Sequence, residues 1–371
     1  MPIFAAGTAR AVTPQVPAVA TKGSARQNRK IRVPGGRTLT ATPVFETYWR
    51  FACKRQDAFM RRVLGEPPPW SDDPVISAHR FTNAYRASDR VSQFLIRHVQ
   101  YDEPRGPVDV FFRTMLFKLF NRIETWEHLV SGIGDVRWSG FSVPRAEAVL
   151  DRVFARRETV YSGAYIMPSP GFGAVRKHAN HLRLLEHMMR DSAALKVAQA
   201  PTMEAVFKVL RGYPSLGDFL AFQLTIDLNY STITNFSEMD FVVAGPGARD
   251  GIRKCFADVD GLNDADVICA VADIANAEID RLGLRFQPLW GRPLQLIDCQ
   301  NLFCEVDKYA RVMHPEFAGA SGRTRIKQRF APAMRPIPQW YPPKWNVRPP
   351  ESKVTPQLRA MGQRSLFSSS A

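Results

Sequence analysis

The chain has 371 residues, 45% of them hydrophobic, and a formal net charge of +15. This length and hydrophobic content support one large domain or two ordinary ones and exclude a chain that is disordered throughout. No stretch reaches the roughly 18 apolar residues of a membrane-spanning helix, and no charged-then-apolar leader precedes a cleavage site. We therefore expect a cytoplasmic protein without membrane contact. The five cysteines are too few and too unevenly spaced for a disulfide framework, so reduced thiols are expected.

The positive charge is concentrated at the two ends. Residues 1–43 contain seven basic residues and no acidic one, residues 319–371 contain ten basic and one acidic residue, and the middle holds 33 basic against 34 acidic residues. Flexible basic arms beside a near-neutral domain favour a polyanion, because phosphate contacts release counterions. The sequence therefore predicts nucleic acid as the partner. Solubilising tails, or an organelle transit peptide at the N-terminus, are the alternatives.

Residues 1–43 lack sustained periodicity, which predicts a disordered basic arm. Helical spacing starts at Val44 and stops at Gly65 and the prolines after it. The same spacing predicts helices over 89–101, 108–121, 145–160, 174–195, 203–210, 219–229 and 264–282. Strand-like alternation is scarce. We predict an all-α domain over 44–318, followed by a basic, proline-rich strap over 319–371 that ends in disorder.

A tight turn within residues 210–221 separates two of these helical patterns. Glycine and proline permit such a turn, and exposed amides near the next helix N-terminus can hold a DNA phosphate, here at Ser215 and Gly217. The segment resembles the hairpin of helix-hairpin-helix DNA glycosylases, in which a catalytic Asp begins a helix about 20 residues later. Asp240 follows Gly217 by 23 residues. Ser215 replaces the usual Gly, and Phe219 replaces the Schiff-base Lys of lyase-type members, so an ordinary helical turn is the alternative.

A wider set of sequence stretches carries a second resemblance. They are residues 80–93, 111–113, 117–126, 162–165, 227–230, 240–248, 298–301, 305–309 and 325–327. Together they resemble the helical domain of hydroxymethyluracil DNA kinases and its stand-alone relatives, the α-glutamyl/putrescinyl-thymine pyrophosphorylases. The resemblance runs from about Phe45 to Trp345 and implies the helix-hairpin-helix glycosylase fold. No Gly-x-x-x-x-Gly-Lys-Ser/Thr loop occurs, so the chain resembles the stand-alone form.

This resemblance implies chemistry on a thymine in DNA whose methyl carbon bears phosphate or pyrophosphate, which an amine or amino acid displaces. It implies DNA with modified thymine and the amine as partners, a separate hydroxymethyluracil DNA kinase as a further partner, and no cofactor. A flipped base needs a pocket, its leaving group needs cations, and the amine needs a base. Trp126, Tyr165, Tyr230 and Phe241 are candidates to stack on the base, although each residue type is more often part of a core.

Several cations are candidates to bind the phosphate. Arg86 and Arg90 are four residues apart with Asp89 between them, so on one helical face they would form a clamp that Asp89 orients. A structural ion network is the alternative. In the basic strap, Arg325 and Lys327 are candidates for DNA contacts.

Two further segments offer phosphate-binding groups. Residues 245–255 form a glycine-rich stretch that would present backbone amides and Lys254, although an ordinary loop is the alternative. Lys308, Arg311 and His314 fall on one helical face at steps of three residues. That face would meet DNA phosphate or the leaving group.

Asp240 is the predicted catalytic base, with Asp89 and Glu305 as alternatives. Cys299 or Cys255 is a possible nucleophile that would add to the pyrimidine ring, but a buried, inert thiol is the alternative. No metal site is expected, because cysteine and histidine lack the paired spacing of a zinc site. Other functions left open are a monofunctional glycosylase, which would need only Asp240 and a water, a non-catalytic DNA-binding module, and a structural subunit for a kinase.

Overall fold

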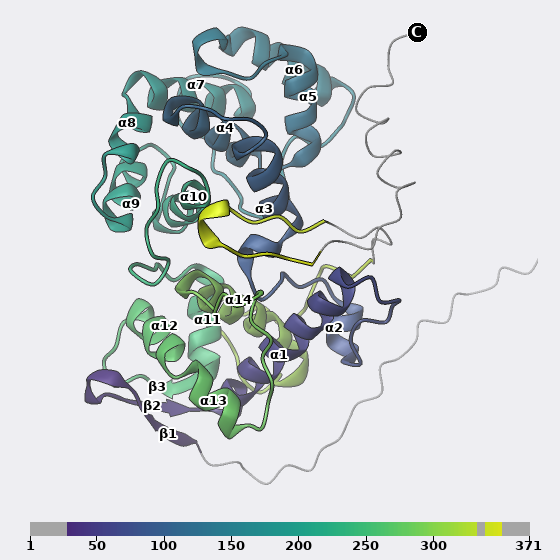
Figure 1. Ribbon diagram of the computed structural model, residues 1–371, viewed down its shortest axis with the longest axis vertical. Coiled ribbons are helices and arrows are strands. Elements are labelled where there is room, and N and C mark those ends of the chain that lie inside the picture. The colour runs from purple at the N-terminus through teal and green to yellow at the C-terminus, as the bar shows by residue number, and fades with distance from the viewer. Residues whose placement is uncertain (1–27, 332–337, 351–371) are drawn as a thin grey trace, which may run out of the picture.

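The helices gather into two lobes, one above the other in Figure 1. The structure is a computed structural model that describes residues 28–331 and 338–350. The upper lobe contains α3 (Arg90–Phe94) with a π-helical turn (Leu95–Gln100), α4 (Pro107–Phe120), α5 (Ile123–Ile133), α6 (Val143–Ala155), α7 (Lys177–Arg190), α8 (Ala193–Ala198), α9 (Met203–Arg211) and α10 (Asp218–Tyr230). The lower lobe contains α1 (Pro43–Val63), α2 (Pro74–Ala78), α11 (Pro246–Cys255), α12 (Asp264–Asp273), α13 (Ala275–Arg281) and α14 (Leu296–Met313).

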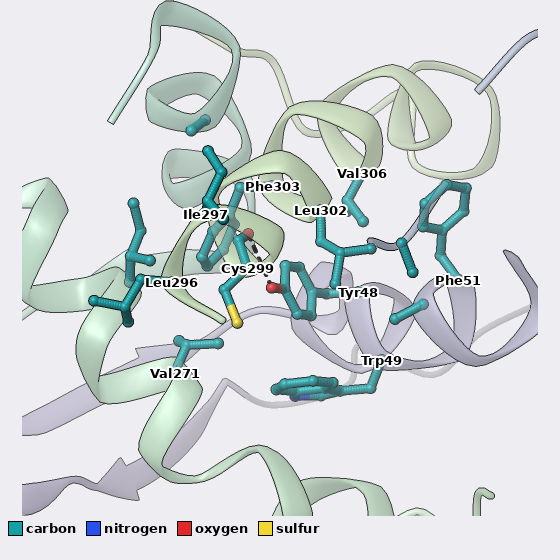
Figure 2. Packing of buried hydrophobic residues seen from close by; sticks show 14 of the residues in the cluster. Tyr48, Trp49, Phe51, Val271, Leu296, Ile297, Cys299, Leu302, Phe303 and Val306 are labelled. Carbon is teal, nitrogen blue, oxygen red and sulfur yellow. Dashed lines mark hydrogen bonds between the residues drawn. The ribbon is translucent and has the colours of Figure 1, made fainter. Parts of the chain in front are cut away.

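Helix α1 shows how local sequence sets an element. The Thr42 hydroxyl accepts a hydrogen bond from Val44 N at 3.2 Å, and Pro43 occupies the first turn, where its missing N–H costs nothing. Tyr48 and Trp49 are fully buried, and α1 packs against α14. Figure 2 shows this contact, in which the Tyr48 hydroxyl donates to Cys299 O at 3.1 Å. The predicted start and end of this helix are thus confirmed within a residue.

Helix α10 belongs to the cores of both lobes. Every residue from Ala221 to Tyr230 is buried, and the apolar side chains divide between the two hydrophobic clusters. Leu224 and Leu228 pack in the upper core, whereas Phe222 and Ile226 pack in the lower core. A helix that is apolar around its whole circumference must be buried on all sides. Asp227, the one charged residue in this buried stretch, is therefore held between the lobes.

A small antiparallel sheet lies at the base of the lower lobe and was not predicted. Strands β1 (Arg29–Arg32) and β2 (Thr38–Ala41) form a hairpin, and β3 (Phe256–Asp258) pairs with β2. Ile31 and Leu39 are buried in the core. Residues 28–43 are thus folded, which corrects the disordered arm expected over 1–43, while residues 1–27 lie outside the described part. The fold is mainly helical, not purely α.

The C-terminal strap, which we define as residues 338–350, passes between the lobes (Figure 1, yellow). Trp340 N donates to Gln93 Oε1 at 2.7 Å, and the Tyr341 hydroxyl lies 2.7 Å from Ser88 Oγ. The strap is therefore docked, which corrects the disorder expected past Trp345 as far as residue 350. Residues 351–371 lie outside the described part. Among the helices that the structure describes, none has both the length and the apolar character needed to cross a bilayer.

Lys344 fixes this strap to the end of α10. Its ammonium donates to the carbonyl oxygens of Asn229, Ser231 and Thr234, each at 2.6 Å, and burial lowers the pKa of Lys344 to about 8. We expect Lys344→Met to lower the free energy of unfolding by about 1–3 kcal/mol, because buried carbonyls lose their donor. Urea unfolding measures this change, with Arg348→Met, at an exposed position of the same strap, as control. Equal stability of the two variants would contradict the prediction.

Candidate active site between the two lobes

Three charged side chains meet in the interior between the lobes. Arg86, Lys118 and Asp227 are 2%, 5% and 0% exposed. Arg86 Nη1 donates to Asp227 Oδ1 at 2.8 Å, and Lys118 Nζ lies 3.1 Å from Asp227 Oδ2. We call these three residues the inter-lobe cluster. Two cations against one carboxylate leave the cluster with one net positive charge.

Each member of the inter-lobe cluster comes from a different element. Lys118 lies in α4, Asp227 lies in α10, and Arg86 lies in a short 3₁₀ turn (Arg86–Ser88). The Arg86 side chain also donates to Gln223 Oε1 at 2.8 Å and to the Tyr230 hydroxyl at 3.1 Å. Arg86 is therefore well satisfied by the protein. Lys118, which further donates only to Asn121 Oδ1 at 2.7 Å among the described residues, is the less constrained cation.

Burial and charge oppose each other within the cluster. Burial alone would raise the pKa of Asp227, but Arg86 and Lys118 outweigh it and hold this pKa below its usual value. Burial lowers the pKa of Lys118, and the nearby Asp227 counteracts this shift only in part. Asp227 is therefore ionised. Of the two cations, Lys118 loses its proton more readily than Arg86, because its pKa is lowered whereas that of Arg86 is raised.

A pair of aromatic rings lies next to these cations. The rings of Tyr165 and Phe219 stack with centroids 5.9 Å apart and an interplanar angle of 13°. Lys118 Nζ lies 5.0 Å from the Tyr165 centroid. Tyr165 and Phe219 are each partly exposed as whole residues. A Cβ added to Gly245 would come within 2.6 Å of Phe219, so glycine is needed where the chain passes this ring. An accessible aromatic surface thus adjoins a buried positive charge.

Asp298 links the inter-lobe cluster to α14. Its Oδ1 accepts a hydrogen bond from Arg86 N at 2.9 Å, and its Oδ2 accepts one from Gln295 N at 3.1 Å. Burial and the nearby Glu238 raise the pKa of Asp298 to about 7. Glu238 in turn pairs with Arg292 at 3.2 Å. The position of Arg86 is therefore fixed from α14 as well as from α10.

The structure separates two residues that the sequence places together. Arg86 is buried in the 3₁₀ turn, whereas Arg90 is exposed at the start of α3. Asp89 between them has extended backbone angles, φ −69° and ψ 146°. The predicted Arg86–Arg90 clamp on one helical face is therefore wrong, because no single helix spans the two residues.

Asp89 and Glu305, the two alternative candidates for the catalytic base, both accept hydrogen bonds from backbone N–H groups of residues 82–83. Asp89 Oδ1 accepts from Asn83 N at 2.8 Å, and burial raises the pKa of Asp89 to about 6. Glu305 accepts from Thr82 N at 3.0 Å and pairs with Lys308 at 2.6 Å. Both carboxylates therefore hold residues 82–89 in place, and Lys308 is committed to Glu305.

Lys254, Arg311 and His314 form internal contacts. Lys254 is 2% exposed and pairs with Asp307 at 2.9 Å, and Arg311 pairs with the other Asp307 oxygen. His314 Nε2 lies 2.7 Å from Thr47 Oγ1. These groups already have partners within the fold, and contact of the Lys308, Arg311 and His314 face with phosphate stays a prediction.

The glycine-rich stretch 245–255 is helical, not a loop. Its residues form α11, which begins after the N-cap residue Gly245. A Cβ added to Gly251 would come within 2.1 Å of Phe303 O, so the glycine serves close packing of α11 on α14. The alternative of an ordinary loop is therefore wrong, and the buried Lys254 is paired with Asp307 and not presented to a phosphate.

Asp240 is exposed and lies in a turn, five residues before the N-cap Gly245 of α11. Its predicted place at a helix start is therefore wrong, because Pro246 sets the first turn of the helix. The loop that carries Asp240 begins at Glu238, which pairs with Arg292. It ends at Gly245, which packs against Phe219. Asp240 thus projects from a segment whose two ends contact the site region.

The structure gives no support to a cysteine nucleophile. Cys255 and Cys299 are fully buried, and Figure 2 shows Cys299 among core residues such as Val271 and Ile297. Burial raises the pKa of Cys299 to about 12 and raises that of Cys255 well above its usual value. Both thiols therefore stay protonated at neutral pH, and a thiol is a poor nucleophile. Within the described residues, no group of His, Cys, Asp and Glu side chains is arranged to hold a metal ion.

The hairpin and the basic segment offer accessible groups. Helices α9 and α10 flank the turn at residues 212–217, in which Ser215 has a left-handed φ of +65° and Gly217 is exposed at the N-cap of α10. Arg325 and Lys327 are exposed as well. These four residues remain candidates for contacts with a nucleic-acid backbone.

Sequence reasoning missed two members of the inter-lobe cluster, Lys118 and Asp227. Both lie inside apolar helices, α4 and α10, whose other residues are nearly all buried. A charge buried within such a helix must be paired, because burying an unpaired charge is costly. The sequence therefore indicated that each of the two residues needs a partner, but it did not indicate that they pair with each other.

The domain is thus mainly helical and holds a buried cluster with one net positive charge between its two lobes. The model of the family described as "5-hmdU DNA kinase, helical domain" matches residues 42–319, and this chain belongs to that family. It is 26% identical over 295 residues to the 5-hmdU DNA kinase of Bacillus phage SP10. The alignment covers 73% of this chain but 45% of the phage protein, so the chain spans about half the length of its curated relative. No solved structure matches the chain.

Proposed function

We propose that this chain modifies a thymine derivative in DNA, by transfer of an amine or amino acid to a methyl carbon that bears phosphate or pyrophosphate. Membership of the 5-hmdU DNA kinase helical-domain family supports the substrate class. The observation that carries the reaction is the net positive charge of the inter-lobe cluster beside the stacked Tyr165 and Phe219 rings. A separate hydroxymethyluracil DNA kinase would supply the phosphorylated base.

The reaction is a displacement in which every group has a role. The amine nitrogen donates its lone pair to the methylene carbon of the base, and the carbon–oxygen bond breaks. The oxygen leaves with the bonding electron pair as phosphate or pyrophosphate, so negative charge develops there, and Lys118 would stabilise it. A flipped base would stack on the accessible face of the aromatic pair. The nitrogen then loses a proton to a base.

Asp240 remains the proposed proton acceptor. It is exposed on a loop whose ends contact the site region, whereas Asp89 and Glu305 are engaged in holding residues 82–89. We expect Asp240→Asn to fold normally and to lower the rate of amine transfer about a hundredfold, the lower end of general-base contributions. The rate is measured on DNA that carries the activated base. A near wild-type rate would show that another group takes the proton.

Contacts with the DNA backbone are proposed for Ser215, Gly217, Arg325 and Lys327, all of them at or near the surface. We expect the double variant Arg325→Gln/Lys327→Gln to weaken DNA binding and to reduce the salt dependence of log K by about two, because each phosphate contact contributes about one to that slope. Filter binding at several salt concentrations measures the slope. Arg190→Gln, at an exposed residue of the upper lobe, is the control. An unchanged slope in the double variant would contradict the proposal.

Mass spectrometry of nucleosides tests the function itself. The full chain is incubated with DNA containing pyrophosphorylated hydroxymethyluracil and with glutamate, glycine or putrescine, and the DNA is then digested. The proposal predicts a new nucleoside whose mass equals that of thymidine plus the amine minus two hydrogens. Release of a free base without amine addition would instead indicate a glycosylase. DNA binding without any change of the base would indicate a non-catalytic module.

A further inference from the structure

A pocket lies in the lower lobe, apart from the inter-lobe cluster. It is formed by α1, α2, the loop between them and the segment around Phe330, and we call it the α1–α2 pocket. The basic and aromatic residues that line it are Arg55, Arg62, Trp70, His79, Phe81 and Phe330. No lining residue is acidic. The proposed amine-transfer reaction uses none of these residues, so the pocket needs its own explanation.

The two arginines of the pocket differ in how far the protein neutralises them. Arg55 Nε donates to Thr82 O at 2.9 Å, and the negative charges of Asp89 and Glu305 act on it. Arg62 contacts Trp70, with its guanidinium carbon 5.5 Å from the ring centroid, and forms no ion pair with any carboxylate in the described residues. Arg62 is partly buried, so its positive charge is available to a ligand that enters the pocket.

Aromatic rings form much of the rest of the pocket. The Trp70 indole is held by a hydrogen bond from its Nε1 to Glu66 O at 2.7 Å. The ring of Phe81 lies in the wall, and Phe330 is fixed by its backbone N–H, which donates to Ala78 O at 3.1 Å. Planar rings held in this way offer stacking surfaces for a planar ligand.

His79 provides a polar group that the protein leaves unused. Its Nδ1 atom is buried and has no hydrogen-bond partner among the described residues. Burial and the nearby Arg329 lower the pKa of His79, so the imidazole is neutral at physiological pH and can donate or accept one hydrogen bond. A buried polar atom without a partner is costly, and a ligand would remove that cost.

We propose that the α1–α2 pocket binds a nucleoside phosphate, either as a free nucleotide or as the phosphorylated end of a DNA strand. Arg62 would bind the phosphate, because a guanidinium matches phosphate oxygens in geometry and charge. The base would stack on Trp70 or Phe81, with His79 at its edge. This proposal does not depend on the amine-transfer proposal, because amine transfer is argued from the inter-lobe cluster and uses no residue of this pocket.

Isothermal titration of the full chain with deoxythymidine 5′-monophosphate tests this proposal. Thymidine and inorganic phosphate serve as ligands that each lack one half of the nucleotide. We expect the nucleotide to bind at least about tenfold more tightly than either half, because ring and phosphate contribute separately. Equal binding of inorganic phosphate and nucleotide, or no binding of the nucleotide, would overturn the proposal. Short oligonucleotides with and without a 5′-phosphate distinguish a strand end from a free nucleotide.

Matched variants assign the binding to this pocket. We expect Arg62→Gln and Trp70→Leu each to weaken nucleotide binding about tenfold or more, a loss of about 1.4 kcal/mol. Arg61→Gln, next to Arg62 on α1 but exposed and paired with Glu66, should bind as the wild type does. Equal affinities of the Arg61 and Arg62 variants would overturn the assignment. Hydrogen exchange of the wild-type chain gives a test without variants, since the nucleotide should protect amides of residues 66–79, and unchanged exchange there would also overturn it.

Discussion

Replacing Lys118 by methionine is expected to lower the rate of amine transfer between about a hundredfold and a thousandfold, the effect of removing one donor that stabilises developing negative charge. The fold should persist, because Arg86 and Asp227 remain a neutral, hydrogen-bonded pair. Methionine matches the length of the lysine stem and fills its space in the core. The loss should therefore be one of chemistry and not of structure.

The measurement is a single-turnover rate on DNA with the activated base, together with the urea unfolding curve of each protein. Lys208→Met is the matched control, since Lys208 is exposed on α9 and pairs only at the surface with Glu204, at 2.8 Å. A Lys118→Met rate within a few-fold of the control would remove Lys118 from the proposed mechanism. Loss of folding in Lys118→Met would show a structural role instead.

Asp227→Asn should have the largest effect on stability. This substitution leaves Arg86 and Lys118 buried without their carboxylate, and breaking a buried pair in this way costs about 3–5 kcal/mol. Asp218→Asn on the same helix removes only an exposed contact with Arg211 and should cost less than about 1 kcal/mol. Free energies of unfolding from urea titration at neutral pH decide between these expectations.

A double variant tests the cause of that loss. In Asp227→Asn/Lys118→Met only Arg86 remains charged, so part of the lost stability should return, and the two effects should not add. Raising the pH should also favour the Asp227→Asn single variant. Lys118 already has a lowered pKa, and without Asp227 it would release its proton more readily on folding. Strictly additive effects of the two substitutions would contradict the coupling.

Sequence patterns predicted the elements better than the site. Apolar spacing located α4 and α10, because a buried helix repeats its apolar residues over several turns. It missed the sheet, whose strands span at most four residues and are too short for alternation to show. It also placed Asp240 at a helix start, although Gly245 and Pro246 are the stronger start signal.

The inter-lobe cluster depends on tertiary packing, which single-sequence patterns do not reveal. The sequence singled out Arg86 as a candidate cation. Its partner Asp227, however, lies in α10, far from Arg86 along the chain. Conversely, Lys254 and Arg311 look like free cations in the sequence and prove to share Asp307 in the fold. Which charge is compensated and which is available is decided only by three-dimensional neighbours.

The most direct test of the proposed function compares the affinity of the chain for two DNAs that differ only in a pyrophosphate on hydroxymethyluracil. Wild-type protein should prefer the pyrophosphorylated DNA by at least about tenfold, since a hydrogen bond to a charged group contributes about 1.5–3 kcal/mol. Lys118→Met should lose this preference while it binds the unmodified DNA as before. An undiminished preference in Lys118→Met would contradict the claim that the inter-lobe cluster receives the leaving group.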